Sequence, residues 1–355
     1  MIRYEYQPSD VPPPGETVEE LLEHFGMSQA ELARRMGRPQ KTINEIILGK
    51  AAITHETALQ LERVLGTPAH FWLNGEARYR EFLARQEDEQ RLREQVAWVK
   101  NFPVREMVAQ GWLVAHEDPL HQLQALLAFF GIAGPEQFHE LRETQHAVFR
   151  KTQKFENDHF ALAAWLRRGE IIAQEIECPP FDKNQFRTTL HQVRALTLRS
   201  FDEARRALID LCAQSGVAVV LTPELPKTHV SGVARWLTPQ KALIQLTCRY
   251  KRADNFWFSF FHEAGHLLLH QKSRIFIDTD SYEGEEEVQA NRFAQNELIP
   301  PAVYQKFRSQ GRPSADTIKR FAVEIGVAPG IVVGRLQHDD GNYQNFNHLR
   351  QPITF

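Results

Sequence analysis

Residues 261–266 read Phe-His-Glu-Ala-Gly-His and lie inside an apolar run from Phe256 to Leu269. This run predicts one buried helix. On such a helix His262 and His266 are four residues apart, so both imidazoles lie on one face and can bind the same metal ion. Glu263 can reach a water molecule on that metal and act as a general base. The H-E-x-x-H pattern is typical of zinc hydrolases, and it predicts a Zn²⁺ site with Glu263 as the catalytic residue.

A catalytic zinc ion needs a third protein ligand and one open position for water. His270 repeats the histidine spacing, but it follows His262 by eight residues. That is about 12 Å along a helix at ~1.5 Å per residue, which is too far for one ion. His270 is therefore expected to end the helix or to support a ligand from behind. The better candidates for the third ligand lie in the acidic stretch from Glu283 to Leu298.

The acidic stretch predicts a helix that starts at Gly284, because carboxylates favour the positive end of a helix. A rotation of about 100° per residue places Glu287 and Asn291 on the face that carries small and apolar residues. Glu287 is therefore predicted as the third metal ligand. Asn291, one turn later, is predicted to orient a ligand histidine. Glu283 is the alternative ligand.

Two segments carry a family resemblance. HEAGHLLLH (residues 262–270) and EVQANRFAQNELIP (residues 287–300) resemble the ImmA/IrrE metallo-endopeptidases, whose pattern is H-E-x-G-H followed by E-x-x-A-N-x-F-A. The resemblance implies a thermolysin-like (gluzincin) domain with zinc on His262, His266 and Glu287. It also implies a protein substrate, because members of this family cut repressors and so switch on prophage, mobile-element or stress genes.

The resemblance extends upstream to residues 230–236 and 241–246, which match the strands before the zinc helix. The run from Leu243 to Leu246 is expected to be either an edge strand, which can pair with an extended substrate, or an ordinary core strand. The residue that stabilises the oxyanion is not assigned, and His229 and Arg249 are its candidates.

A second motif lies near the N-terminus. Residues 27–37 begin with a serine N-cap and end at Gly37, and residues 39–50 predict another short helix that ends at Gly49. Two short helices joined by a tight turn are typical of the helix-turn-helix unit. Polar residues near the helix starts are predicted to contact DNA, where base edges are read. These residues are Gln29, Gln40, Lys41, Thr42 and Asn44.

The span from Pro14 to Tyr79 resembles the HigA-type branch of the Xre antitoxin and repressor family. The resemblance rests on GMSQAELARRMG, on INEI followed by GK, and on LG followed by FWLN. It implies operator DNA as a partner and a homodimer. Acidic residues are at least as numerous as Lys and Arg up to Arg80, which is unlike a strong DNA-binding domain. The alternative is a retained fold that serves only dimerisation or docking.

Composition restricts the class of protein. The 355 residues are enough for two or three domains, and a formal net charge of −3 gives no general attraction to nucleic acid or membrane. No apolar run reaches the ~20 residues that cross a bilayer, and residues 1–16 do not resemble a signal peptide. Cys178, Cys212 and Cys248 are widely spaced, which indicates reduced thiols. These features predict a cytoplasmic protein without membrane partners.

The expected architecture is mainly α-helical. A helix-turn-helix DNA-binding domain is expected in residues 1–80, a helical linker or sensor region in residues 81–200, and a small α+β zinc-peptidase domain in residues 201–355. Residues 317–336 show a further helix, turn and helix, but the second helix starts without polar residues, so a packing role is expected. The polar tail from His338 to Phe355 is expected to form a surface arm.

These observations predict a transcriptional regulator with a zinc-dependent endopeptidase domain. It would cut a repressor or antitoxin-type protein, either itself or a partner, in a stress, prophage, toxin-antitoxin or defence system. The alternative is a non-catalytic HigA-like antitoxin or repressor that binds operator DNA and a partner toxin or signal. The intact Glu263 favours the enzyme, because a purely structural zinc site does not need it. A free-standing digestive peptidase is disfavoured by the helix-turn-helix and the lack of an export signal.

Overall fold

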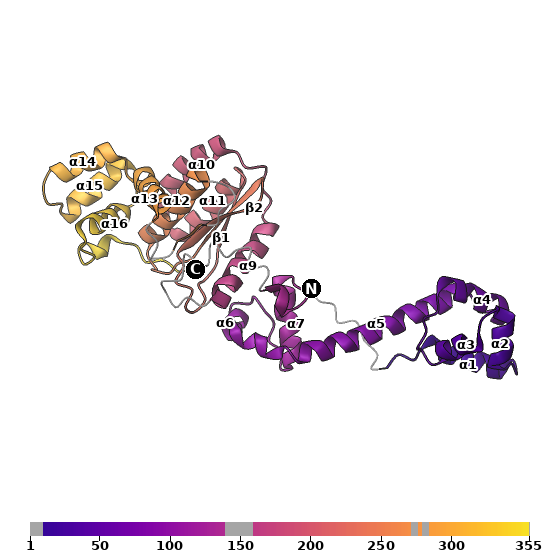
Figure 1. Ribbon diagram of the computed structural model, residues 1–355. Coiled ribbons are helices and arrows are strands. Elements are labelled where there is room, and N and C mark those ends of the chain that lie inside the picture. The colour runs from indigo at the N-terminus through magenta and orange to yellow at the C-terminus, as the bar shows by residue number, and fades with distance from the viewer. Residues whose placement is uncertain (1–9, 139–158, 271–275, 279–283, 355) are drawn as a thin grey trace. The chain divides into compact units, whose positions relative to one another are not determined.

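Figure 1 shows the computed structural model, which describes residues 10–138, 159–270, 276–278 and 284–354. These residues form two compact units, one up to Val96 and the other from Ala97. Helices dominate both, and one small sheet lies in the second unit, which confirms the predicted fold class. The division into residues 1–80, 81–200 and 201–355 stays a prediction. No helix in the described part of the chain is long and apolar enough to cross a bilayer.

The described residues of the first unit, from Asp10 onward, contain five helices: α1 (Pro14–His24), α2 (Gln29–Met36), α3 (Gln40–Ile47), α4 (His55–Leu65) and α5 (Ala69–Arg93). The Ser28 side chain accepts a hydrogen bond from the Glu31 N–H and starts α2, and Gly37 ends it with φ of 65°. Both ends were expected from the sequence, since cap residues act on the adjacent backbone.

The core of this first unit fixes the orientation of α3. Ile43, Ile46 and Ile47 of α3 are buried in a cluster that includes Trp72. A Cβ atom on Gly15 of α1 would overlap the Ile46 carbonyl oxygen, so only glycine allows α1 to lie this close to α3. The opposite face of α3 consequently points to solvent.

The second unit begins with η1 (Val96–Asn101), α6 (Val104–Ala109), α7 (Pro119–Phe130) and α9 (His159–Glu175). Aromatic rings hold this part together. The centroids of Phe138 and Phe160 lie 5.5 Å apart in a stacked pair, and the Phe102 ring lies 5.4 Å from Phe138 and 5.0 Å from Phe160. The chain continues through α10 (Lys183–Ala195), η2 (Leu196–Leu198) and α11 (Phe201–Ala213).

The sheet has four strands in the order β1-β3-β2-β4: β1 (Val217–Leu221), β2 (Gly232–Thr238), β3 (Lys241–Leu246) and β4 (Phe276–Asp278). Strand β3 pairs with β1 in parallel and with β2 in antiparallel fashion. It is therefore an inner strand, and the edge-strand alternative for Leu243 to Leu246 is wrong. Its neighbours occupy both of its hydrogen-bonding edges, so no substrate backbone can pair with it.

Helices cover both faces of the sheet. Ala218, Val220 and Leu243 pack with Ala173 of α9, whereas the alternate residues Val217, Val219 and Ile244 belong to the main core. On the α9 side, the buried Gln245 donates from Nε2 to the Trp165 carbonyl at 2.7 Å, and Arg235 donates to the Leu166 carbonyl at 2.8 Å. The expected linker or sensor region thus contributes a helix that packs directly on the sheet.

The chain ends with α12 (Ala253–Leu269), α13 (Glu285–Leu298), α14 (Pro301–Ser309), α15 (Ala315–Ile325), α16 (Pro329–Asp340) and η3 (Asn347–Leu349). Ile318 of α15 and Val332 of α16 are fully buried in the main core, in keeping with a packing role. The expectation that the tail forms a surface arm is wrong at Arg350. Arg350 forms an ion pair of 2.7 Å with the buried Asp254 of α12, which fixes the tail against the start of that helix.

Candidate metal centre

Helices α12 and α13 pack along each other and carry the predicted metal ligands. Gly265 allows the close approach, because a Cβ atom there would lie 3.3 Å from the Ala290 Cα. His262 and His266 project from α12 toward Glu287, which lies in the first turn of α13. A helix N-terminus favours a carboxylate at that position, so the local sequence of α13 stabilises the ligand that it supplies.

The three candidate ligand atoms form a compact triangle. The Nε2 atoms of His262 and His266 lie 2.9 Å apart. Glu287 Oε2 lies 3.0 Å from His262 Nε2 and 3.3 Å from His266 Nε2. Tetrahedral zinc binds such atoms at about 2.0–2.1 Å, which places them about 3.3 Å from one another. The spacing and the donor set of two imidazoles and one carboxylate therefore fit Zn²⁺, with a fourth position left for water.

The protonation of these groups suits metal binding. Burial lowers the pKa of His266 to about 4, although a hydrogen bond with Glu287 opposes the shift. Burial alone would raise the pKa of Glu287, but hydrogen bonds with His262 and His266 more than offset it and lower the pKa to about 2. At neutral pH His266 is therefore a neutral imidazole and Glu287 an ionised carboxylate. These are the forms that bind a metal ion.

Asn291 lies behind His262. Its Oδ1 atom is 2.9 Å from His262 Nδ1. A carboxamide oxygen only accepts hydrogen bonds, so the imidazole must carry its hydrogen on Nδ1. The lone pair of Nε2 is then free to bind a metal. This geometry is compatible with the orienting role predicted for Asn291, which stays a prediction.

His270 lies behind His266. The two Nδ1 atoms are 3.0 Å apart, and His270 Nε2 is 3.3 Å from Oε1 of Gln289. Gln289 in turn donates from Nε2 to Glu285 at 3.4 Å. His270 also ends α12, so both roles expected for it are combined in one residue. No sequence pattern points to Gln289, because its contact with His270 depends on how the two helices pack.

The proposed base, Glu263, is fully buried beside the sheet. A Cβ atom on Gly232, the first residue of β2, would lie 2.8 Å from Glu263 Oε1 and 2.9 Å from Leu246 Cδ2. Only a glycine leaves this space, so β2 and α12 together fix the position of the carboxylate.

Three other residues were predicted for this site, namely His229, Arg249 and Glu283. Arg249 donates to the His229 carbonyl at 2.9 Å, so the two oxyanion candidates contact each other at the surface. His229 has a φ of 48°, in the left-handed region. The alternative ligand Glu283 lies outside the described residues.

The candidate DNA-contacting residues lie at the start of α2 and in the first turns of α3. Gln40, Lys41 and Asn44 are exposed near the start of α3, while Thr42 and Gln29 are half-buried. The exposed polar side of α3 is opposite the three buried isoleucines. This geometry suits a helix that presents its N-terminal side chains to a groove.

Comparisons with known families match both units. Residues 18–72 match the helix-turn-helix family model, and residues 212–337 match the model of the IrrE N-terminal-like domain, a peptidase family. The second match includes β1, the metal centre and most of α16.

Three relatives illustrate the similarity. The HTH-type transcriptional regulator YddM of Escherichia coli K12 is 38% identical over 63 residues, which are 18% of this chain and 67% of that protein. The Pseudomonas aeruginosa antitoxin HigA, solved with the higBA promoter, is 30% identical over 23% of this chain and 90% of that chain, with a TM-score of 0.22. An addiction module antidote protein of the HigA family from Coxiella burnetii is 32% identical over 24% of this chain and 92% of that chain, with a TM-score of 0.22.

Proposed function

We propose that this chain is a DNA-binding regulator and a zinc-dependent endopeptidase. It belongs to the helix-turn-helix family over residues 18–72 and to the IrrE N-terminal-like family over residues 212–337. Its substrate is a repressor or antitoxin-type protein, either the chain itself or a partner. Cleavage switches gene expression in a stress, prophage, toxin-antitoxin or defence system. The observation that carries the proposal is the buried triangle of His262, His266 and Glu287 beside the buried Glu263.

Peptide hydrolysis at this site needs a polarised carbonyl, an activated water molecule and a proton carrier. His262, His266 and Glu287 would hold Zn²⁺, which would supply the Lewis acid that polarises the carbonyl and makes water more acidic. Glu263 accepts the proton of the attacking water on a carboxylate oxygen and passes it to the leaving amine nitrogen. Asn291 and His270 keep the ligand imidazoles in the tautomer that leaves each Nε2 unprotonated.

The first unit is proposed to bind operator DNA as a homodimer. Its overall balance of charge is not basic, but the charges are unevenly distributed. Between residues 29 and 50 there are five basic residues and two acidic ones, whereas residues 16–23 of α1 contain four acidic residues and no basic one. The basic residues are Arg34, Arg35, Arg38, Lys41 and Lys50. The positive charge is therefore concentrated on α2, on α3 and on the residues that follow each of them, which would contact the phosphate backbone.

The decisive test is intact-mass analysis of the full chain, expressed with its neighbouring genes before and after DNA damage. The wild type is compared with Glu263→Gln, which removes the base and keeps all three ligands. We expect a fragment of the substrate with the wild type and none with the variant. Metal analysis of both proteins should give the same zinc content, so that loss of cleavage is assigned to the base.

A second outcome supports another function. If neither protein yields a fragment under any condition, while both retain zinc and bind operator DNA, the chain is a non-catalytic HigA-like antitoxin or repressor. Its second unit then binds a toxin or a signal.

A further inference from the structure

A cavity of about 560 Å³ lies beside the metal centre, within the second unit. Phe258 and Ser259 of α12 line it one turn before His262, and the ring centroids of Phe258 and His262 are 6.4 Å apart. On α13 the lining residues are Gln295 and Leu298, which follow Asn291 by one and two turns. The cavity thus begins next to a proposed metal ligand and runs along both helices toward the start of α12.

The body of the cavity is apolar. Leu298, Ile299 and Ile331 are buried in its wall. Tyr250 and Tyr343 also line it and are 45% and 62% exposed. Ligand pockets in proteins have volumes of about 300–1,000 Å³ and are lined mainly by apolar side chains with a few fixed polar groups. The size and the lining therefore fit a bound molecule or two to three residues of a peptide.

Two charged residues of the lining, Arg350 and Asp254, pair with each other. Arg350 donates from Nε to Asp254 at 2.9 Å, from Nη1 to Gln337 at 3.0 Å and from Nη2 to Asn255 at 2.6 Å. This network attaches the tail to α12 and α16. All three guanidinium nitrogens of Arg350 donate within this network, which fixes the side chain in place.

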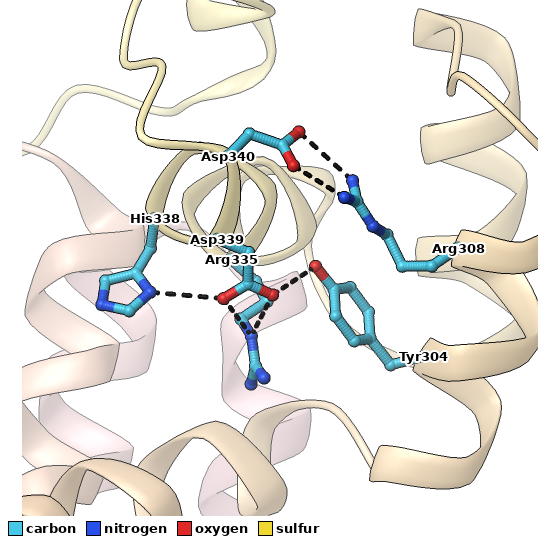
Figure 2. Close-up of polar contacts among 6 residues, drawn as sticks. All are labelled: Tyr304, Arg308, Arg335, His338, Asp339 and Asp340. Atoms are coloured by element: carbon cyan, nitrogen blue, oxygen red, sulfur yellow. Dashed lines mark hydrogen bonds and ion pairs between the residues drawn. The ribbon is translucent and has the colours of Figure 1, made fainter.

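Arg335 of α16 is held differently (Figure 2). Its Nε atom donates to both oxygens of Asp339, at 3.1 and 2.9 Å, and its Cζ atom lies 4.8 Å from the centroid of the Tyr304 ring. Tyr304 also donates from its hydroxyl to Asp339 at 2.8 Å. Within the described part of the chain, neither terminal nitrogen of Arg335 makes a hydrogen bond, and Figure 2 shows both pointing away from Asp339.

We propose that this cavity binds a carboxylate carried on an apolar body, with Arg335 as the residue that selects the carboxylate. Two parallel N–H donors of a fixed guanidinium match two carboxylate oxygens, whereas a carboxamide offers one oxygen. The lining itself contains two cationic side chains, Arg335 and Arg350, and one acidic side chain, Asp254. Asp339 pairs with Arg335 through Nε and is not among the lining residues, so the two terminal nitrogens remain as donors for an anion. A cationic ligand would face unpaired donors.

The carboxylate has two possible sources. It is the side chain of a Glu or Asp next to apolar residues in the protein substrate, in which case the inference rests on the proposed peptidase function. Otherwise it belongs to a free small molecule that occupies the cavity and controls access to the metal centre. Both sources present the same chemistry to Arg335, and binding measurements separate them.

The test uses the full chain loaded with zinc and carrying Glu263→Gln, so that no probe is consumed. Isothermal titration compares 3-phenylpropionate with 3-phenylpropanamide. It also compares two acetylated and amidated peptides, Ala-Ala-Phe-Glu-Phe-Ala and its Gln analogue. We expect the acid of at least one pair to bind about 10- to 100-fold more tightly than the amide, as charge-assisted hydrogen bonds allow.

Arg335→Gln should reduce this preference to about one. Its control is Arg308→Gln, which removes a neighbouring ion pair on α16, between Arg308 of α14 and Asp340 at 2.7 Å. Arg308 does not line the cavity, so its variant should keep the full preference for the acid. If both variants lose the preference for the acid to the same extent, the loss reflects the packing of α16. That result would overturn the role of Arg335.

The remaining outcomes also decide the question. A preference limited to the peptide pair assigns the cavity to the substrate, and one limited to phenylpropionate assigns it to a small ligand. Equal binding of acid and amide, or no binding of any probe at millimolar concentration, overturns the proposal. Because binding is measured without cleavage, an inactive wild type with an intact acid preference would disprove the peptidase function alone.

Discussion

The Nδ1 atoms of His266 and His270 lie 3.0 Å apart, so one imidazole donates a hydrogen and the other accepts it. If His266 is to bind a metal through Nε2, its hydrogen must be on Nδ1, and His270 must accept. His270 then carries its own hydrogen on Nε2, which faces the acceptor Oε1 of Gln289 at 3.3 Å. Every donor in this series meets an acceptor, so the protein around His266 is arranged for the metal-binding tautomer before any metal arrives.

Loss of the hydrogen bonds that join His266, His270 and Gln289 should weaken zinc binding. We expect His270→Phe and Gln289→Leu to lower the affinity for Zn²⁺ by about 10- to 100-fold, as is typical for groups that orient metal ligands. Competition with a chromogenic chelator measures the change. Asn296→Leu is the control, because Asn296 is an exposed amide on the same helix. Equal effects in the control and in Gln289→Leu would contradict the role of Gln289.

Asn291 offers a test in both directions. Asn291→Leu removes the acceptor for His262 Nδ1, so zinc affinity should again fall by about 10- to 100-fold. Asn291→Asp keeps an acceptor and adds a charge that strengthens the hydrogen bond, so its affinity should equal or exceed that of the wild type. The same chelator competition compares them. A loss in both variants would indicate that Asn291 acts through packing instead.

The metal-free protein should lose stability as the pH falls. Burial lowers the pKa of His266 from 6.5 to about 4, so the unfolded chain takes up this proton first. The neutral imidazole therefore contributes fully above pH ~6.5, and its contribution, of up to about 3 kcal/mol, is lost as the pH falls toward 4. The depressed pKa of Glu287, about 2 instead of 4.5, adds a second loss below pH ~4.5.

Urea denaturation of the metal-free chain between pH 8 and pH 4, followed by circular dichroism, measures this dependence. His266→Gln cannot take up the proton, so its free energy of unfolding should vary less between pH 6.5 and pH 4 than that of the wild type. Identical slopes in the two proteins would rule out His266 as the group responsible.

Gly232→Ala should separate catalysis from metal binding. The new Cβ atom would lie 2.8 Å from Glu263 Oε1, so the carboxylate must move. We expect cleavage to fall by about 100-fold, because a base displaced by about 1 Å loses its alignment with the attacking water. Zinc affinity should stay within a few-fold of the wild type, since the atoms nearest to the new Cβ belong to Glu263 and Leu246 and not to a metal ligand. A variant that cuts normally would show that the position of Glu263 is not critical.

Two residues of α3 should affect DNA binding in different ways. Asn44→Ala is expected to weaken binding to the operator by about 10- to 100-fold and leave non-specific binding unchanged, as for loss of a base contact. Lys41→Ala should weaken binding to all sequences and reduce the salt dependence by about one counterion. Fluorescence anisotropy at several salt concentrations distinguishes the two. Glu23→Gln, on the acidic helix α1, serves as the control and should change neither.

Local features of this protein follow from the sequence. Ser28 and Gly37 mark the ends of α2 because cap residues act on the backbone beside them. His262 and His266 share a face because helical geometry fixes the positions of residues four apart. Glu287 is placed by the same rule, as the acid on the packed face of its helix. The structure brings its carboxylate to 3.0 Å from His262, although 25 residues separate the two.

Contacts between distant elements were decided only by the tertiary structure. The inner position of β3, the pairing of Arg350 with Asp254 and the contact of Gln289 with His270 each join segments with no common periodicity. The cavity beside Arg335 has the same origin, since three helices and the tail enclose it. The sequence by itself determined which side chains share a helix face and therefore which chemistry is available. How those faces pack, and which polar group each buried side chain meets, depends on the simultaneous burial of apolar surface from the whole unit, and no local pattern records that.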